Sequence, residues 1–196
     1  MEADQAAKII KTFKWDVLRS IYGGAHSSII GFLSTMWVGQ SKDNSVLDGA
    51  PSPITGGRRL GQKNADILLC KNGSPFIVVE VETNVSKYQD KLRSLQAYLQ
   101  NNMNYAGVEF GMMVMMNFCK ADMKYKHNWN VIKREVEEAQ VNIALVSIEK
   151  ARAILDGSVL GKLRSRNDYY PWEIVKIDYW VRDESGAISE GNLLTR

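Results

Sequence analysis

A hairpin of apolar strands with acids at one end constrains this chain more than any other feature of the sequence. Residues 65–83 read ADILLCKNGSPFIVVEVET, two runs rich in Val, Ile, Leu and Phe around an Asn-Gly pair. Asp66 stands where the first run begins, and Glu80 and Glu82 stand where the second ends. Carboxylates beside so much apolar surface are unfavourable unless something neutralises them. The sequence therefore predicts a buried strand pair with a charged site at one end.

The alternation of side chains along a strand decides which of these acids share a face. Glu80 and Glu82 fall on one face of the second strand together with Phe76 and Val78. Both faces of this strand begin apolar, which is typical of a central strand covered on both sides. We therefore expect one face to become acidic only at the C-terminal end of the strand.

The length of the turn decides whether Asp66 joins the two glutamates. A two-residue Asn-Gly loop would pair Asp66 with Val79 and point its side chain to the opposite face. A three-residue Lys-Asn-Gly loop over residues 71–73 would pair Asp66 with Val78 and bring it beside Glu80. We expect the three-residue loop, and hence three acids on one face.

Three carboxylates that converge in this way repel one another, and a cation relieves the repulsion. A hard divalent ion with a preference for oxygen ligands, Mg²⁺ or Mn²⁺, suits such a site. The ion would keep bound water, act as a Lewis acid and activate that water. A zinc site with several histidines is not expected, because the chain has only two. In the alternative interpretation, the acids are ordinary strand-end residues paired with surface lysines.

The remaining pattern predicts an α/β sandwich with a mixed sheet. Apolar residues at helical spacing predict an N-terminal helix over residues 2–22, and residues 27–39 fit either a strand or a buried helical turn. Residues 39–64 read as a long loop. The other expected elements are helices over 86–102, 127–140 and 149–155, strands over 108–118 and 141–148, and a C-terminal hairpin over 172–190. We interpret the four methionines of the 108–118 run as core packing in a central strand.

Length, charge and hydropathy narrow the class of protein. The 196 residues suit a single domain with its core over about residues 60–150. No apolar run approaches the length of a membrane span, and the N-terminus lacks the pattern of a secretory signal, so we expect a cytoplasmic protein without a membrane partner. The net charge of +3 permits an anionic partner without requiring one.

The order of Asp66, a hairpin, Glu80-Val81-Glu82 and an amphipathic helix resembles the PD-(D/E)XK nuclease superfamily, which includes many restriction endonucleases and resolvases. The resemblance covers about residues 60–150. It implies a restriction-endonuclease-like core with αβββαβ order around a mixed central sheet flanked by helices. It also implies that Asp66 and Glu80 bind Mg²⁺ or Mn²⁺. The third residue of the motif, usually Lys, positions or deprotonates the attacking water, and Glu82 stands in that place.

This chain departs from the superfamily pattern at two positions. Ala65 replaces the usual Pro, which is a mild change, and Glu82 replaces the usual Lys. The resemblance extends to some restriction enzymes of this superfamily that also have Glu at the third position of the motif. Lys87, at the start of the following helix, would reach back as a relocated catalytic lysine, and Lys91 lies one turn further on the same face. An acid on the first helix often contributes in the superfamily, and the candidates here are Glu2, Asp4 and Asp16.

Two basic stretches are candidate DNA contacts. The loop before Asp66 carries Arg58, Arg59 and Lys63, and the stretch over residues 161–172 carries cations among aromatic residues. Cations beside a scissile phosphate would contact the flanking phosphates and make binding depend on salt. Solvated loops are the alternative interpretation of both stretches. The complete set of expected DNA-binding residues is Arg58, Arg59, Lys63, Lys91, Arg164 and Arg166.

The resemblance implies a metal-dependent DNA endonuclease, of restriction or phage type. A homodimer is expected for double-strand cleavage, because each active site of this kind cuts one strand. One alternative is a nuclease-like fold that binds nucleic acid without cutting it, which Glu82 in place of Lys favours. Another is a glycosidase with paired carboxylates, which is disfavoured because no aromatic residue other than Phe76 adjoins the motif.

Overall fold

The described part of the chain forms an α/β structure in which a seven-stranded mixed sheet packs against four helices. The computed structural model describes residues 1–20, 26–48, 65–83, 88–100, 107–118, 123–152 and 172–194. The strands lie side by side in chain order, and β3, β4 and β5 are parallel while the other neighbouring pairs are antiparallel. The strands are β1 (Asn44–Asp48), β2 (Ile67–Lys71), β3 (Ser74–Glu82), β4 (Phe110–Phe118), β5 (Ile143–Arg152), β6 (Trp172–Arg182) and β7 (Ile188–Asn192).

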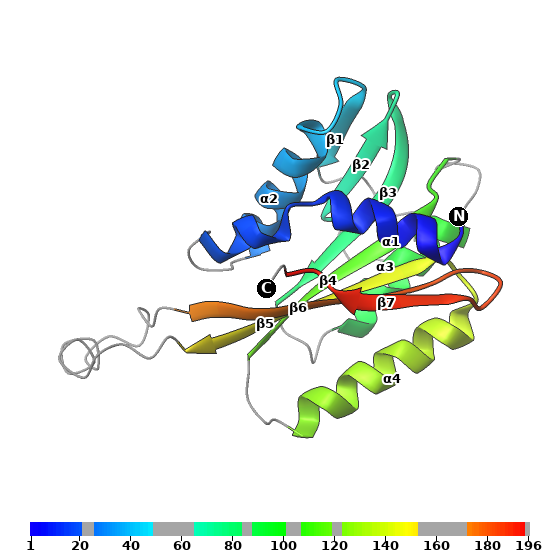
Figure 1. Ribbon diagram of the computed structural model, residues 1–196. Coiled ribbons are helices and arrows are strands. Elements are labelled where there is room, and N and C mark those ends of the chain that lie inside the picture. Colours follow the sequence, from blue (N-terminus) through cyan, green and yellow to red (C-terminus); the bar gives the residue numbers. More distant parts are fainter. Residues whose placement is uncertain are drawn as a thin grey trace, which may run out of the picture.

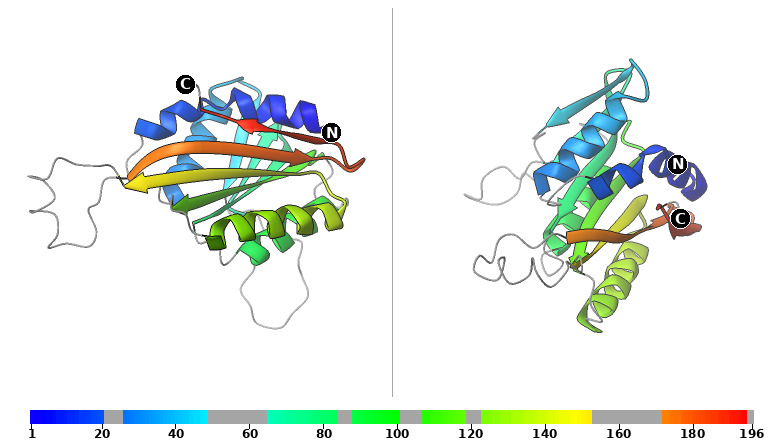
Figure 2. Two further views of the ribbon diagram at one scale, coloured as in Figure 1. Left: turned by 60° about the horizontal axis from the view of Figure 1, so that its bottom comes forward. Right: turned by 60° about the vertical axis from the view of Figure 1, so that its left-hand side comes forward.

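Helices cover both faces of the sheet. One face packs against α1 (Ala3–Thr12), a 3-10 helix (Trp15–Ser20) and α2 (His26–Val38). The other face packs against α3 (Tyr88–Gln100) and α4 (Met123–Ala139), as Figures 1 and 2 show. The crossovers through α3 and α4 lie on the same face, as right-handed connections require when parallel strands are added in one direction. Among the described residues, no helix is long and apolar enough to cross a membrane.

The central strand β4 is buried on both faces. Met112 and Val114 point into the layer of α1 and α2, and Met113 and Met115 point into the layer of α3 and α4. Each of these four side chains is at most 1% exposed. This confirms the methionines as core packing in a continuous apolar strand.

The expected N-terminal helix is confirmed over Ala3–Thr12, but its extension to residue 22 is wrong, because the α-helix ends at Thr12. Phe13 has extended backbone angles, and a separate 3-10 helix follows over Trp15–Ser20. The indole Nε1–H of Trp15 donates to the main-chain carbonyl of Ile10 at 2.7 Å. The Ile10 carbonyl in the last turn of α1 therefore accepts two donors, the main-chain N–H of Phe13 at 3.3 Å and the shorter bond from the buried Trp15 indole.

In one further segment the structure selects between two predicted alternatives, and in two others it differs from the prediction. Residues 27–38 lie within the helix α2, which is the second of the two alternatives. The expected loop over residues 39–64 contains β1, which pairs antiparallel with β2. Residues 149–152 are strand, not the start of a helix, because they extend β5 and pair with β6. The C-terminal hairpin is confirmed as β6 and β7.

The β2–β3 hairpin turns through two residues, so the expected three-residue loop is wrong. Lys71 pairs with Ser74, and Asn72 and Gly73 between them have φ of 52° and 75°. Positive φ at both central residues is what a type I′ turn requires, and Asn-Gly is its preferred pair. Taken alone, this turn would place Asp66 on the wrong face of the sheet.

A β-bulge in β3 brings the side chain of Asp66 back to the face of the sheet on which Glu80 lies. Cys70 pairs with Pro75 but Leu69 pairs with Ile77, so Phe76 is an extra residue in β3. From there the register is shifted by one residue, and Asp66 comes to the face of Glu80. Phe76 itself packs in the α1–α2 layer, not on the face of Glu80 as strict alternation predicts.

Candidate functional site

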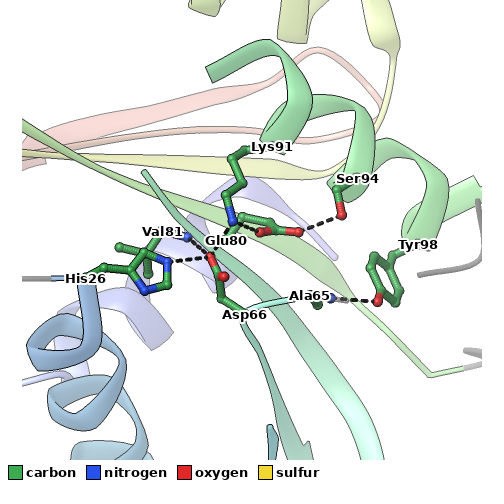
Figure 3. A network of polar contacts seen from close by, with 8 residues as sticks. All are labelled: His26, Ala65, Asp66, Glu80, Val81, Lys91, Ser94 and Tyr98. Atoms are coloured by element: carbon green, nitrogen blue, oxygen red, sulfur yellow. Dashed lines mark hydrogen bonds and ion pairs between the residues drawn. The ribbon is translucent and has the colours of Figure 1, made fainter. Parts of the chain in front are cut away.

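Asp66 and Glu80 share one cation, the ammonium group of Lys91 (Figure 3). The Nζ atom of Lys91 lies 2.8 Å from Asp66 Oδ2 and 2.7 Å from Glu80 Oε2. Asp66 directly precedes β2, Glu80 lies near the C-terminal end of β3, and Lys91 lies in the first turn of α3. The structure therefore brings together three residues that we selected from the sequence.

Glu80 is the most deeply buried member of this group, with 1% of its surface exposed. Ser94, almost one turn after Lys91 on α3, donates a hydrogen bond from Oγ to Glu80 Oε1 at 2.6 Å. Burial raises the pKa of Glu80 to about 7, although the charge of Lys91 and the hydrogen bonds from Lys91 and Ser94 act in the opposite direction. The nearby charge of Asp66 adds to the increase. Near neutral pH, this carboxyl group is therefore partly protonated.

Asp66 behaves in the opposite way. Burial acts to raise its pKa, but donors around Oδ2 outweigh burial and lower the pKa below the ordinary value. These donors are Lys91 and the main-chain N–H of Val81, which lies 2.7 Å from Oδ2, with a further contribution from the charge of His26. The pKa values of the two acids are thus shifted in opposite directions, a pattern that often accompanies chemistry at paired carboxylates.

His26 is a member of the site that sequence reasoning did not select. It is the first residue of α2, and its Nε2 lies 3.2 Å from Asp66 Oδ2. Figure 3 shows it approaching from α2, while Lys91 and Ser94 approach from α3. No neighbour of His26 in the sequence marks it as functional; the contact exists because α2 packs against β1, β2 and β3.

Ser94 and Tyr98 are two further members that the sequence did not reveal. Together with Lys91 they form a polar stripe along α3 at helical spacing, and the stripe points at the strands (Figure 3). The Tyr98 hydroxyl accepts a hydrogen bond from the buried N–H of Ala65 at 3.0 Å. The same helix therefore positions both the backbone before Asp66 and the side chain of Glu80.

Of the remaining predicted motif and DNA-binding residues, the structure describes only Glu82. Glu82 is the last residue of β3 and is half-buried, two positions after Glu80. The expected catalytic lysine, Lys87, lies outside the described residues, and so do the expected DNA contacts other than Lys91: Arg58, Arg59, Lys63, Arg164 and Arg166. We expected Lys91 to contact DNA, and the structure places it between the two acids.

The oxygen atoms of Asp66 and Glu80 fit a hard divalent cation such as Mg²⁺ or Mn²⁺. Within the described ranges, no group of three or more His, Cys, Asp or Glu side chains is arranged to hold a metal. An ion bound here would take its ligands from two carboxylates and complete its shell with water, as Mg²⁺ commonly does. Lys91 now supplies the positive charge that such an ion would bring.

Comparisons of this chain with protein-family models, with curated proteins and with solved structures give no match. The function is therefore argued from the geometry of the site.

Proposed function

We propose that this protein is a metal-dependent DNA endonuclease related to the PD-(D/E)XK superfamily. The observation that carries the proposal is the convergence of Asp66, Glu80 and Lys91: an acid just before the first strand of a hairpin, an acid near the end of its second strand, and a lysine from the helix that follows. The elements from α2 to β4 support it, because their order is helix, three strands, helix and strand. This is the αβββαβ order that the resemblance implies for a restriction-endonuclease-like core.

We assign the relocated lysine of the motif to Lys91. Its side chain reaches both acids from α3, whereas the usual lysine position on β3 is occupied by Glu82. An ammonium group that stays near the metal without bonding to its ligands is suited to hold the attacking water and to stabilise charge as the phosphate is attacked. Glu82, at the end of the same strand, is suited to accept a proton from that water.

Asp66 and Glu80 hold the metal in this proposal, and His26 orients Asp66 from the α2 side. A bound Mg²⁺ or Mn²⁺ would supply Lewis-acid activation of the scissile phosphate and of a water molecule. The His26 side chain is 42% exposed, whereas Glu80 and Ser94 are buried. In this proposal a phosphate group reaches Asp66 past His26.

Cleavage of supercoiled plasmid and of short duplexes in the presence of Mg²⁺ or Mn²⁺ tests the proposal. We expect metal-dependent cutting by the wild type and loss of cutting in Asp66→Asn and Glu80→Gln. Glu190→Gln is the matched control, since Glu190 is an exposed carboxylate paired with Lys133 on another part of the sheet. Absence of cutting by the wild type, or cutting that persists in both site variants, would contradict the proposal.

The products of the same assay test the expected homodimer. A monomer with one site cuts one strand and releases nicked circles, whereas two sites acting together release linear plasmid. We expect linear product whose share rises with protein concentration. Nicked circles at every concentration would instead favour a single-strand nickase.

The second candidate is a nuclease-like protein that binds nucleic acid without cutting it. The bridging ammonium of Lys91 favours it, because this group already neutralises the buried acids without a metal. Binding of a labelled duplex that is unaffected by Mg²⁺ and by Glu80→Gln, in a preparation without cleavage, would support this candidate over the nuclease.

A further inference from the structure

We infer that Lys91 is an exchangeable counter-cation, which leaves the two acids when a divalent ion binds, while Ser94 holds Glu80 in place in both states. The inference rests on the proposed function, because it takes Asp66 and Glu80 as the metal ligands. It goes beyond that function by stating how the site passes from its metal-free to its metal-bound form.

The first step is that the site has room for one cation between the acids. Lys91 Nζ is within 2.8 Å of one oxygen of each carboxylate. A Mg²⁺ ion bound by the same oxygens would lie about 2.1 Å from each and so would occupy nearly the same position. Two positive charges so close together repel each other strongly here, because Glu80 is buried and water screens the charges beside it only weakly. Binding of the ion therefore requires Lys91 to move.

The second step is that Lys91 is the group able to move. Its side chain is 24% exposed, and its flexible stem allows the ammonium to turn toward water. The two acids keep other donors when it leaves: Ser94 Oγ on Glu80 Oε1, and the main-chain N–H of Val81 on Asp66 Oδ2. Ser94 is 3% exposed and has a short side chain, so its bond to Glu80 is the fixed part of the site.

Exchange predicts opposite effects of two substitutions that touch the same carboxylate. Lys91→Met removes the competing cation, so calorimetric titration with Mn²⁺ is expected to give about tenfold tighter binding or more. Ser94→Ala removes the anchor of Glu80 and is expected to weaken Mn²⁺ binding about tenfold. Lys91→Arg keeps the charge and is expected to bind no more tightly than the wild type. A purely structural role would weaken Mn²⁺ binding, or leave it unchanged, in both Lys91→Met and Ser94→Ala.

A measurement on the wild type removes any dependence on the folding of a variant. Acetylation of lysine side chains, followed by mass spectrometry, reports how accessible each amine is. Lys133 is the internal reference, because it is 23% exposed and also paired with a carboxylate, that of Glu190. We expect Mn²⁺ to increase the acetylation rate of Lys91 severalfold and to leave that of Lys133 unchanged.

The outcomes separate this inference from the proposed function. If the wild type binds Mn²⁺ and Glu80→Gln does not, but Lys91 acetylation is unchanged and Lys91→Met binds no more tightly, exchange is overturned and the nuclease proposal stands. If neither the wild type nor Lys91→Met binds Mn²⁺, the metal-dependent function and the exchange both fail.

Discussion

The indole Nε1–H of Trp37 donates a hydrogen bond to the main-chain carbonyl of Cys70 across 2.8 Å. Cys70 lies where the register of the β2–β3 hairpin shifts, and the Trp37 ring also stacks on Phe76, the extra residue of the bulge, with centroids 5.9 Å apart. One side chain of α2 thus holds both strands of the bulge. Because the bulge turns Asp66 toward Glu80, Trp37 supports the candidate site from the opposite face of the sheet.

Replacement of Trp37 by Phe is therefore expected to affect both stability and the site. An aromatic ring remains to stack on Phe76, but the buried carbonyl of Cys70 loses its donor, which costs about 1–3 kcal/mol of unfolding free energy. Urea unfolding measures this loss, and Mn²⁺ titration measures the effect on the acids. Trp15→Phe is the control, since it removes the same kind of bond, to Ile10, away from the hairpin. Equal loss of Mn²⁺ affinity in both variants would show that Trp37 has no specific effect on the site.

The turn of the same hairpin offers a second prediction. Gly73 has φ of 75°, and no described atom lies within 4 Å of the position that a Cβ would take. Gly73→Ala therefore adds conformational strain without a clash, and we expect it to lower the unfolding free energy by about 1–2 kcal/mol. Asn72→Gly, at the other left-handed position, is expected to cost a few tenths of that, because glycine accepts the same angles. Equal stability of Gly73→Ala and the wild type in urea unfolding would contradict the type I′ assignment.

The hairpin also marks the limit of what its sequence predicts. The apolar runs and the Asn-Gly pair locate both strands and the turn, and the shared face of Asp66 and Glu80 is as expected. The cause of this shared face differs from the expectation. A two-residue turn together with a bulge places Asp66 on the face of Glu80, whereas we expected a three-residue loop to do so. The bulge is not encoded locally, since Phe76 takes its face from packing against Trp37, a residue of a distant helix.

The other helices and strands also fall into two groups: those that the local sequence predicts, and those that depend on packing against distant parts of the chain. The helix α3 and the strands β4 and β5 follow from long apolar or strongly periodic runs. Residues 149–152 have the composition of a helix, but pairing with β6 makes them strand, a tertiary effect that outweighs local propensity. His26 and Ser94 reach the site only through the packing of α2 and α3, so the two acids could be predicted from the sequence but these contacts could not.

The anchoring of the chain before Asp66 gives a third prediction. Tyr98 is 1% exposed and its hydroxyl accepts the N–H of Ala65, which is also 1% exposed. Tyr98→Phe leaves this buried N–H without its acceptor and is expected to cost about 1–3 kcal/mol in urea unfolding. Tyr88→Phe is a matched control, because it removes a hydroxyl bonded to the partly buried Glu135. A smaller loss is expected for Tyr88→Phe, and the reverse order would contradict the role assigned to Tyr98.

The buried carboxyl group of Glu80 gives a pH dependence with a definite sign. Its pKa is about 7 in the folded protein, against the ordinary glutamate pKa of 4.5 that applies to the unfolded chain, so the folded state binds more protons between these values. Stability is therefore highest at the acid end of this window and falls as pH rises through it, by on the order of 3 kcal/mol. The lowered pKa of Asp66 acts in a different window, because its contribution is lost only as pH falls below about 4.

Urea unfolding of the metal-free protein at a series of pH values from about 4.5 to 7 measures this slope. Glu80→Gln isolates the contribution of Glu80 from that of other groups, since Gln mimics the protonated acid but cannot ionise. We expect the slope in the wild type and in the exposed control Glu190→Gln, and a much flatter profile in Glu80→Gln. A wild-type profile as flat as that of Glu80→Gln would mean that Glu80 stays ionised throughout. The ammonium of Lys91 would then outweigh the cost of burying the carboxylate.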